Sequence, residues 1–116
     1  MSERLAPLVR EILQDGEDDW VMLDSVVAYA WEHAEASGTA PEDVTKEFLT
    51  TLLGEDLMEI GDLAEEGFRP WDLPPLEAVD RCLADLESYD WEPRGALSWL
   101  SITEKGRCHL RELEGN

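Results

Sequence analysis

The sequence is poor in basic residues, and this shortage restricts the partners that the protein can bind. Nine Lys and Arg stand against 28 Asp and Glu in 116 residues, which gives a formal net charge of −19. Nucleic acids are polyanions, and the proteins that bind them usually present a patch of Lys and Arg. We therefore do not expect direct nucleic-acid binding, and we expect a basic protein partner attracted electrostatically. The alternative is an acidic surface that serves solubility alone.

Cysteines and long apolar segments are also scarce. Cys82 and Cys108 each stand alone, without a Cys or His at the close spacing of a zinc site, and we expect two buried, reduced thiols. The N-terminus lacks the basic segment and apolar run of a secretory signal. The longest nearly uncharged stretch, residues 20–31, is interrupted by Asp24 and is too short to span a bilayer. These features predict a cytoplasmic protein without membrane contact.

Sequence motifs for catalysis and for cofactor binding are missing. The glycines match neither a phosphate-binding loop nor a dinucleotide fingerprint. No Ser or Cys stands in a motif that would mark a nucleophile beside His33 or His109. The acidic run 15–19 lacks the spacing of an EF-hand loop. We therefore expect no enzyme, no cofactor and no metal site. An unrecognised enzyme is the alternative, and it would require a deep pocket with convergent polar groups and a displaced pKa.

The chain nevertheless has enough apolar material for a core. Hydrophobic residues make up 43% of it, including five Trp, and many recur at helical spacing. We expect Trp20, Trp31 and Trp99 to belong to the core of one domain over residues 1–116. The patterns predict helices over residues 4–14, 25–37, 41–53, 75–86 and after Thr103, and strands over residues 57–60 and 97–102. Residues 20–23 form either a short strand or the entry to the second helix.

This order of elements predicts a mainly α protein with a small β-hairpin, of the α+β class. Without the helix that begins at Pro75, it is the order of a winged helix, in which a helix pair precedes a two-stranded hairpin. Residues 100–107, Leu-Ser-Ile-Thr-Glu-Lys-Gly-Arg, resemble the last strand and turn of many bacterial winged-helix proteins. This resemblance implies a winged-helix-like domain with an extra helix inserted in the wing.

A second resemblance involves three short segments: Gly61-Asp62-Leu63, Gly67-Phe68 and Pro70-Trp71-Asp72. In this arrangement they are similar to a family of short, acidic bacterial proteins of unknown function. The resemblance covers roughly residues 57–107. It implies no activity and assigns no functional residues.

The helix over residues 41–53 takes the place of the helix that reads DNA in a winged-helix protein. Recognition helices usually offer Arg, Lys, Asn or Gln to bases and phosphates. This helix has one base, Lys46. Its acids are Glu42, Asp43 and Glu47, and we take them as candidates for binding a basic partner. If DNA is bound instead, the other bases best placed to help lie near the C-terminus: Lys105, Arg107 and Arg111.

The turn-rich segment 62–72 holds the remaining candidates, Phe68, Arg69 and Trp71. Aromatic residues and Arg often anchor protein interfaces, so one interpretation is a partner-binding surface on the extended wing. The other is that Phe68 and Trp71 fold back over the sheet and the fourth helix, and this is the one we favour. The apolar stripe of that helix can pack on its own domain or on a second copy, so the oligomeric state is open.

These observations predict a non-enzymatic interaction module that binds a basic protein through an acidic surface. An immunity protein for a toxin and a DNA-mimicking inhibitor both fit this description. The alternative function is that of a winged-helix transcription regulator, which requires the few basic side chains to converge on one face.

Overall fold

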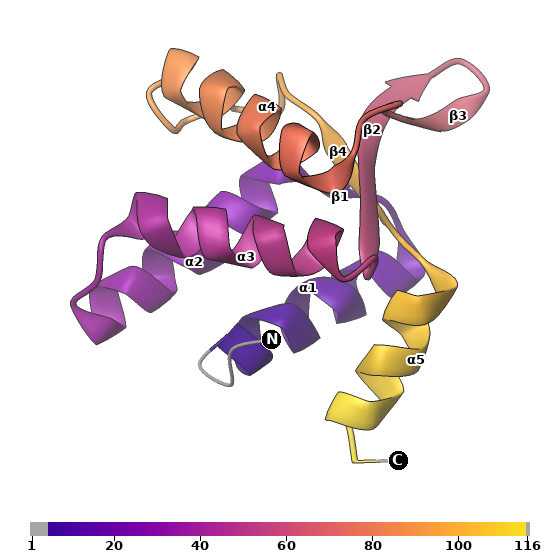
Figure 1. Ribbon diagram of the computed structural model, residues 1–116, viewed down its shortest axis with the longest axis horizontal. Coiled ribbons are helices and arrows are strands. Elements are labelled where there is room, and N and C mark those ends of the chain that lie inside the picture. The colour runs from indigo at the N-terminus through magenta and orange to yellow at the C-terminus, as the bar shows by residue number, and fades with distance from the viewer. Residues whose placement is uncertain (1–4, 116) are drawn as a thin grey trace.

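The computed structural model describes residues 5–115, which form five helices and a four-stranded antiparallel sheet (Figure 1). The predicted α+β class, mainly helical, is confirmed. The expected helix start at Arg4 lies outside the described residues. The helices are α1 (Ala6–Asp18), α2 (Leu23–Ser37), α3 (Pro41–Gly54), α4 (Pro75–Ser88) and α5 (Glu104–Leu113). The strands are β1 (Val21–Met22), β2 (Met58–Ala64), β3 (Gly67–Pro70) and β4 (Trp99–Ile102).

The sheet joins strands that are far apart in the sequence. Its order is β1-β4-β2-β3, with β4 between β1 and β2. Leu100 of β4 pairs with Val21 on one side and with Ile60 on the other, and all three are buried. Side chains alternate along a strand, so the sheet has an inner face toward the core and an outer face that carries Met22 and Trp99.

The segment 62–72, which we expected to be a loop, contains a hairpin instead. β2 continues to Ala64 and turns through Glu65 and Glu66 into β3, with Leu63 opposite Phe68. The Gly, Pro and acidic residues in this segment are typical of turns and hide its alternating pattern. The helix inserted before the last strand is α4, as the sequence predicts.

Two helix boundaries also differ from the predictions. α1 continues through Gly16 to Asp18, beyond the predicted end at residue 14, and this glycine packs against the sheet: a Cβ there would lie 3.1 Å from Met58 Cε. α2 begins directly after β1, with Met22 as its N-cap residue, so Asp24 lies in the first turn rather than at the cap.

Helix α3 lies at the centre of the molecule. α2 packs on one side of it and α4 on another (Figure 1). Its buried residues include Thr45, whose hydroxyl donates a hydrogen bond to the Pro41 carbonyl oxygen at 2.8 Å. The side chains that are well exposed on α3 are Glu42, Asp43 and Lys46. The helix that takes the place of the DNA-reading helix of a winged-helix protein is therefore largely covered.

Several large apolar residues lie elsewhere than the sequence predicts. Trp20 is 40% exposed and Trp99 is half-buried, whereas Trp31 is half-buried and packs against the core. On α4, Leu76 is 65% exposed, although its spacing places it on the apolar stripe. The helix instead turns a face with small residues toward α3, because small side chains let two helices approach closely. That buried face consists of Ala78, Val79, Cys82 and Leu86.

The start of α5 depends on the hydroxyl of Thr103, as the sequence predicts. Thr103 Oγ1 accepts a hydrogen bond from the Gly106 N–H at 2.9 Å and donates to the Asp56 carbonyl oxygen at 2.6 Å. Replacing Thr103 with Ala is expected to lower the free energy of unfolding by about 1.5 kcal/mol, because both bonds are lost. Urea unfolding measures this loss. Thr103→Ser keeps the hydroxyl and should retain most of the stability, and equal losses in both variants would contradict the capping role.

Candidate functional site

An exposed group of apolar side chains lies on the outer face of the sheet, at the β2–β3 hairpin. Leu63 and Phe68 are direct cross-strand neighbours, so their side chains share one face. The Trp20 ring stacks on Phe68 with 6.3 Å between the ring centroids. Trp20 is 40% exposed, Leu63 is 41% exposed and Phe68 is half-buried. We call Trp20, Leu63 and Phe68 the aromatic patch.

Carboxylates lie next to members of the aromatic patch: Glu17–Asp19 line a surface pocket together with Trp20, and Glu65 and Glu66 form the turn between β2 and β3. They come from the end of α1, from β2 and from the hairpin turn: Glu17, Asp18, Asp19, Glu59, Glu65 and Glu66. Two guanidiniums lie near them, and each is engaged by an acid. Arg69 pairs with Glu66, and Arg107 lies 3.7 Å from the Glu17 carboxylate. We call these six acids the acidic rim. Its charge exceeds that of the two bases, so the rim favours cationic ligands.

One carboxylate of the acidic rim, that of Glu66, has a lowered pKa. A hydrogen bond from its own backbone N–H, and then the hydrogen bond from Arg69, lower the pKa of Glu66. Glu66 is fully exposed, so the shift describes its charge rather than a contribution to stability. The Glu66 carboxylate therefore keeps its charge to a lower pH than a free glutamate does, and Arg69 pairs with it.

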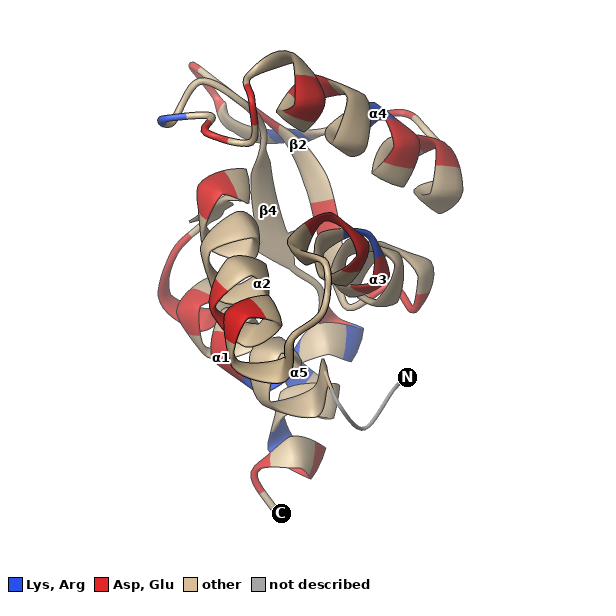
Figure 2. Cartoon of the chain, turned by 90° about the vertical axis from the view of Figure 1, so that its left-hand side faces the viewer, with Lys and Arg blue, Asp and Glu red and all other residues tan. Residues whose placement is uncertain are grey.

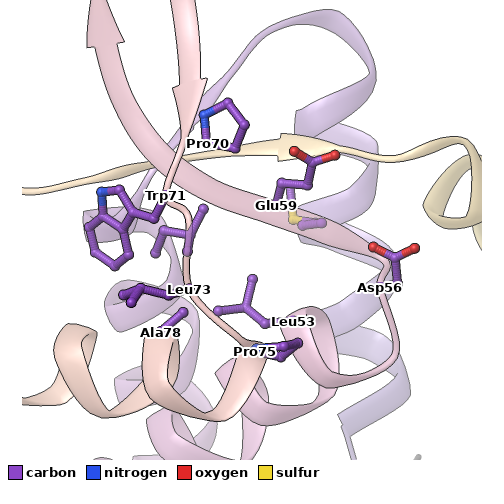
Figure 3. A pocket seen from close by; sticks show the side chains of 10 residues that line it. Leu53, Asp56, Glu59, Pro70, Trp71, Leu73, Pro75 and Ala78 are labelled. Carbon is purple, nitrogen blue, oxygen red and sulfur yellow. The ribbon is translucent and has the colours of Figure 1, made fainter.

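A pocket of about 240 Å³ lies at the base of the same hairpin (Figure 3). Trp71 forms one end, and the carboxylates of Asp56 and Glu59 lie toward the other. Its apolar lining includes Leu53, Ile60, Leu73, Pro75 and Ala78. An apolar channel that ends at two carboxylates suits a side chain with an aliphatic stem and a cationic end, as in Lys and Arg.

Three interactions fix the Trp71 wall of this pocket. Its backbone N–H donates to the Ile60 carbonyl oxygen at 2.9 Å, and its indole Nε1 donates to Asp62 at 3.0 Å. The Arg81 guanidinium of α4 lies 3.7 Å from the ring centroid, in cation–π geometry. Trp71 thus folds against α4, as the interpretation we favoured predicts, and it serves as a rigid wall.

The structure separates the six candidate residues into two groups. Phe68, Arg69 and Trp71 lie on the hairpin and the segment that follows it. The acids of α3 lie toward the N-terminal end of that helix, whereas its C-terminal end leads to the hairpin through β2 (Figure 1). The two groups therefore lie in different parts of the fold. The α3 acids are Glu42 and Asp43, which are exposed, and Glu47, which is half-buried.

Sequence reasoning missed Trp20 and Leu63 as members of the site. Trp20 stands beside an apolar run, which suggested burial. The signal for exposure was the acidic run Glu17–Asp19 directly before it, because such a run needs solvent. Leu63 gave no such signal, since its exposure depends on the hairpin that the sequence did not reveal.

The described residues give little support for catalysis or for a metal site. No three His, Cys, Asp or Glu side chains among residues 5–115 gather in a way that could hold a metal ion. Asp15 accepts a hydrogen bond from Tyr29 Oη at 2.5 Å, and this bond raises the pKa of Tyr29 to about 12. The described groups with clearly displaced pKa values are Tyr29, Glu66 and Cys82, which lie on α2, in the hairpin turn and on α4 and do not converge.

The two thiols differ in exposure, which corrects the expectation that both are buried. Both are free; Cys82 is buried in α4 and Cys108 is exposed on α5. Burial raises the pKa of Cys82 to about 12, so it is protonated at neutral pH and unreactive. We expect Ellman's reagent to modify one thiol per native chain and both in denaturant. Cys108→Ser should leave no rapidly reacting thiol, and two fast thiols in the native protein would contradict the burial of Cys82.

Comparisons with known proteins do not identify the chain. Among residues 5–115, no helix has the length and apolar character required to cross a membrane. The chain matches no protein-family model, no curated protein and no solved structure. The winged-helix resemblance therefore stays a prediction, and the function has to be argued from the surface itself.

Proposed function

We propose that this protein is a non-enzymatic interaction module that binds a basic protein partner through the outer face of its β2–β3 hairpin. The observation that carries the proposal is the exposed aromatic patch with acids of the acidic rim beside it. Interfaces commonly have a buried aromatic centre with a polar edge, and large aromatics supply most of the binding energy. Trp20 and Phe68 provide that centre in a pre-stacked pair.

The charges support a basic partner rather than a nucleic acid or a second copy of the chain. The acidic rim repels phosphates, and it repels the same rim on another molecule of net charge −19. An immunity protein and a DNA mimic both satisfy this description.

A winged-helix transcription regulator is the second candidate, and the pairing of β2 with β4 around the inserted α4 favours it. Two features weigh against it. α4 covers one side of α3, and α3 is the helix that would have to enter the major groove of DNA. The basic side chains also lie in separate places rather than on one face (Figure 2). Within the described residues they are Arg10, Lys46, Arg69, Arg81, Arg94, Lys105, Arg107 and Arg111.

Site-specific photo-crosslinking in the native cell tests the proposal. A photoreactive amino acid at position 63 lies in the aromatic patch, and the same group at position 76 lies on α4, where Leu76 is exposed. We expect position 63, and not position 76, to crosslink to a protein of positive net charge that then binds directly when purified. Equal crosslinking from both positions, or capture of a nucleic acid or an acidic protein, would overturn the proposal.

A further inference from the structure

A second pocket lies away from the hairpin, between α2 and the connection from α4 to β4. It has a volume of about 400 Å³. The residues that matter for its chemistry are Asp24, Trp31, Trp91, Glu92 and Arg94. Neither the aromatic patch nor the acidic rim contributes to it, so its function is independent of the proposed one.

Two indole rings form the wall of this pocket. The Trp31 and Trp91 ring centroids are 5.3 Å apart, and the ring planes are tilted by 38°. Both side chains are half-buried, so part of each ring faces the pocket. The backbone holds Trp91 in place, since its N–H donates to the Leu86 carbonyl oxygen at 2.8 Å. Indole faces attract cations more strongly than other aromatic rings do.

Residues around Trp91 have a left-handed backbone conformation, which residues other than glycine rarely adopt. Asp90, Trp91 and Arg94 have φ angles of 54°, 63° and 49°. Such conformations are energetically unfavourable, and they often occur at sites where a loop is held for a purpose. The connection is tied to α2 by the Gly95 N–H, which donates to Asp24 Oδ2 at 2.9 Å.

The negative charge of Asp24 is not fully compensated. Its Oδ1 atom is buried and has no hydrogen-bond partner, although buried polar atoms are almost always paired. The two other charged residues of the pocket face each other, with Arg94 3.6 Å from the Glu92 carboxylate. The net charge that remains beside the two indoles is therefore the carboxylate of Asp24.

We propose that this pocket binds a quaternary ammonium group. Aromatic walls beside a carboxylate are the recognised chemistry for such cations, which are weakly hydrated and place their charge against the ring faces. A trimethylammonium group has no N–H to donate, so the charge of the Asp24 carboxylate attracts it without a hydrogen bond. The same group occurs on small molecules such as choline and on trimethylated lysine of a protein.

NMR titration of the native protein tests this proposal. The indole N–H signals of the five Trp are followed during addition of choline, and separately of 3,3-dimethylbutan-1-ol, its neutral isostere. We expect choline to shift the signals of Trp31 and Trp91 with saturation, and the neutral alcohol to leave them in place. Equal shifts from both compounds, or shifts from choline at other Trp residues only, would overturn the proposal.

Two variants test whether the Asp24 carboxylate attracts the choline cation. Asp24→Asn keeps an acceptor for the Gly95 N–H but removes the charge, and it should weaken choline binding about tenfold. Asp80→Asn, an exposed change on α4 outside the pocket, should leave the affinity unchanged. Unchanged binding in Asp24→Asn would contradict the assignment. If a peptide with trimethyllysine binds more tightly than choline, the natural ligand is a methylated protein. If choline binds more tightly than the peptide, the natural ligand is a small molecule.

Discussion

Replacing Gly106 with Ala is expected to lower the free energy of unfolding by about 3 kcal/mol, the largest single effect on stability that we predict. A Cβ at this position would lie 2.1 Å from the Leu57 carbonyl oxygen and 2.9 Å from Ile102 Cγ1. The carbonyl belongs to the backbone ahead of β2, and it also accepts the Thr103 N–H at 3.1 Å. The clash cannot be relieved without moving α5 away from the sheet.

Urea unfolding followed by circular dichroism measures this effect. Gly54→Ala is the matched control, because a Cβ there meets nothing within 4 Å and the residue ends α3. Alanine in place of a helical glycine should leave the stability unchanged or raise it by up to about 1 kcal/mol. A Gly106→Ala protein as stable as the wild type would show that α5 does not pack on Leu57 as described.

Replacing Trp20 with Ala is expected to weaken binding of the basic partner about 30-fold, or about 2 kcal/mol, as for an aromatic residue at the centre of an interface. The side chain gives the aromatic patch its largest exposed ring and supports Phe68 by stacking. Isothermal titration calorimetry with the purified partner measures the change.

The control for this prediction is Leu76→Ala. It removes another large exposed apolar side chain, which lies on α4 and outside the patch. It should change the affinity by less than a factor of about two. Leu63→Ala provides a second variant in the patch that does not disturb the stacked ring pair. If all three variants bind equally well, the aromatic patch is not the interface.

The helices were the part of the fold that could be predicted from local sequence. Their apolar residues recur at helical spacing, and α3 begins at Pro41 and ends with Gly54 as predicted. Thr103 also caps α5 as its position indicates. These features depend on residues close in the chain, which is why the sequence alone reveals them.

Features that depend on distant packing could not be predicted. Gly106 lies in the first turn of α5, where glycine is a poor helix former, yet it is required because the Leu57 carbonyl lies against it. Gly16 lies beyond the predicted end of the first helix, yet it belongs to α1 and lets this helix pass close to Met58. In both cases the decisive neighbour is more than 40 residues away, and no local pattern records it.

The candidate site was predicted only in part, for the same reason. Phe68 and Trp71 were identified by residue type, but the hairpin that sends them to different surroundings was not. The acids of α3 were chosen because a winged helix would expose that helix. α4 packs over one side of it instead, and this contact joins segments that the sequence gives no reason to pair.

The most direct test of the central claim is the salt dependence of partner affinity. The dissociation constant is measured for the purified complex between about 50 mM and about 500 mM NaCl, a range over which screening of exposed charges becomes nearly complete. The proposed function places a basic surface of the partner against the acidic rim, so we predict that the affinity falls steadily with salt, and that Glu65→Gln with Glu66→Gln flattens this slope. An affinity that does not change with salt would contradict the claim.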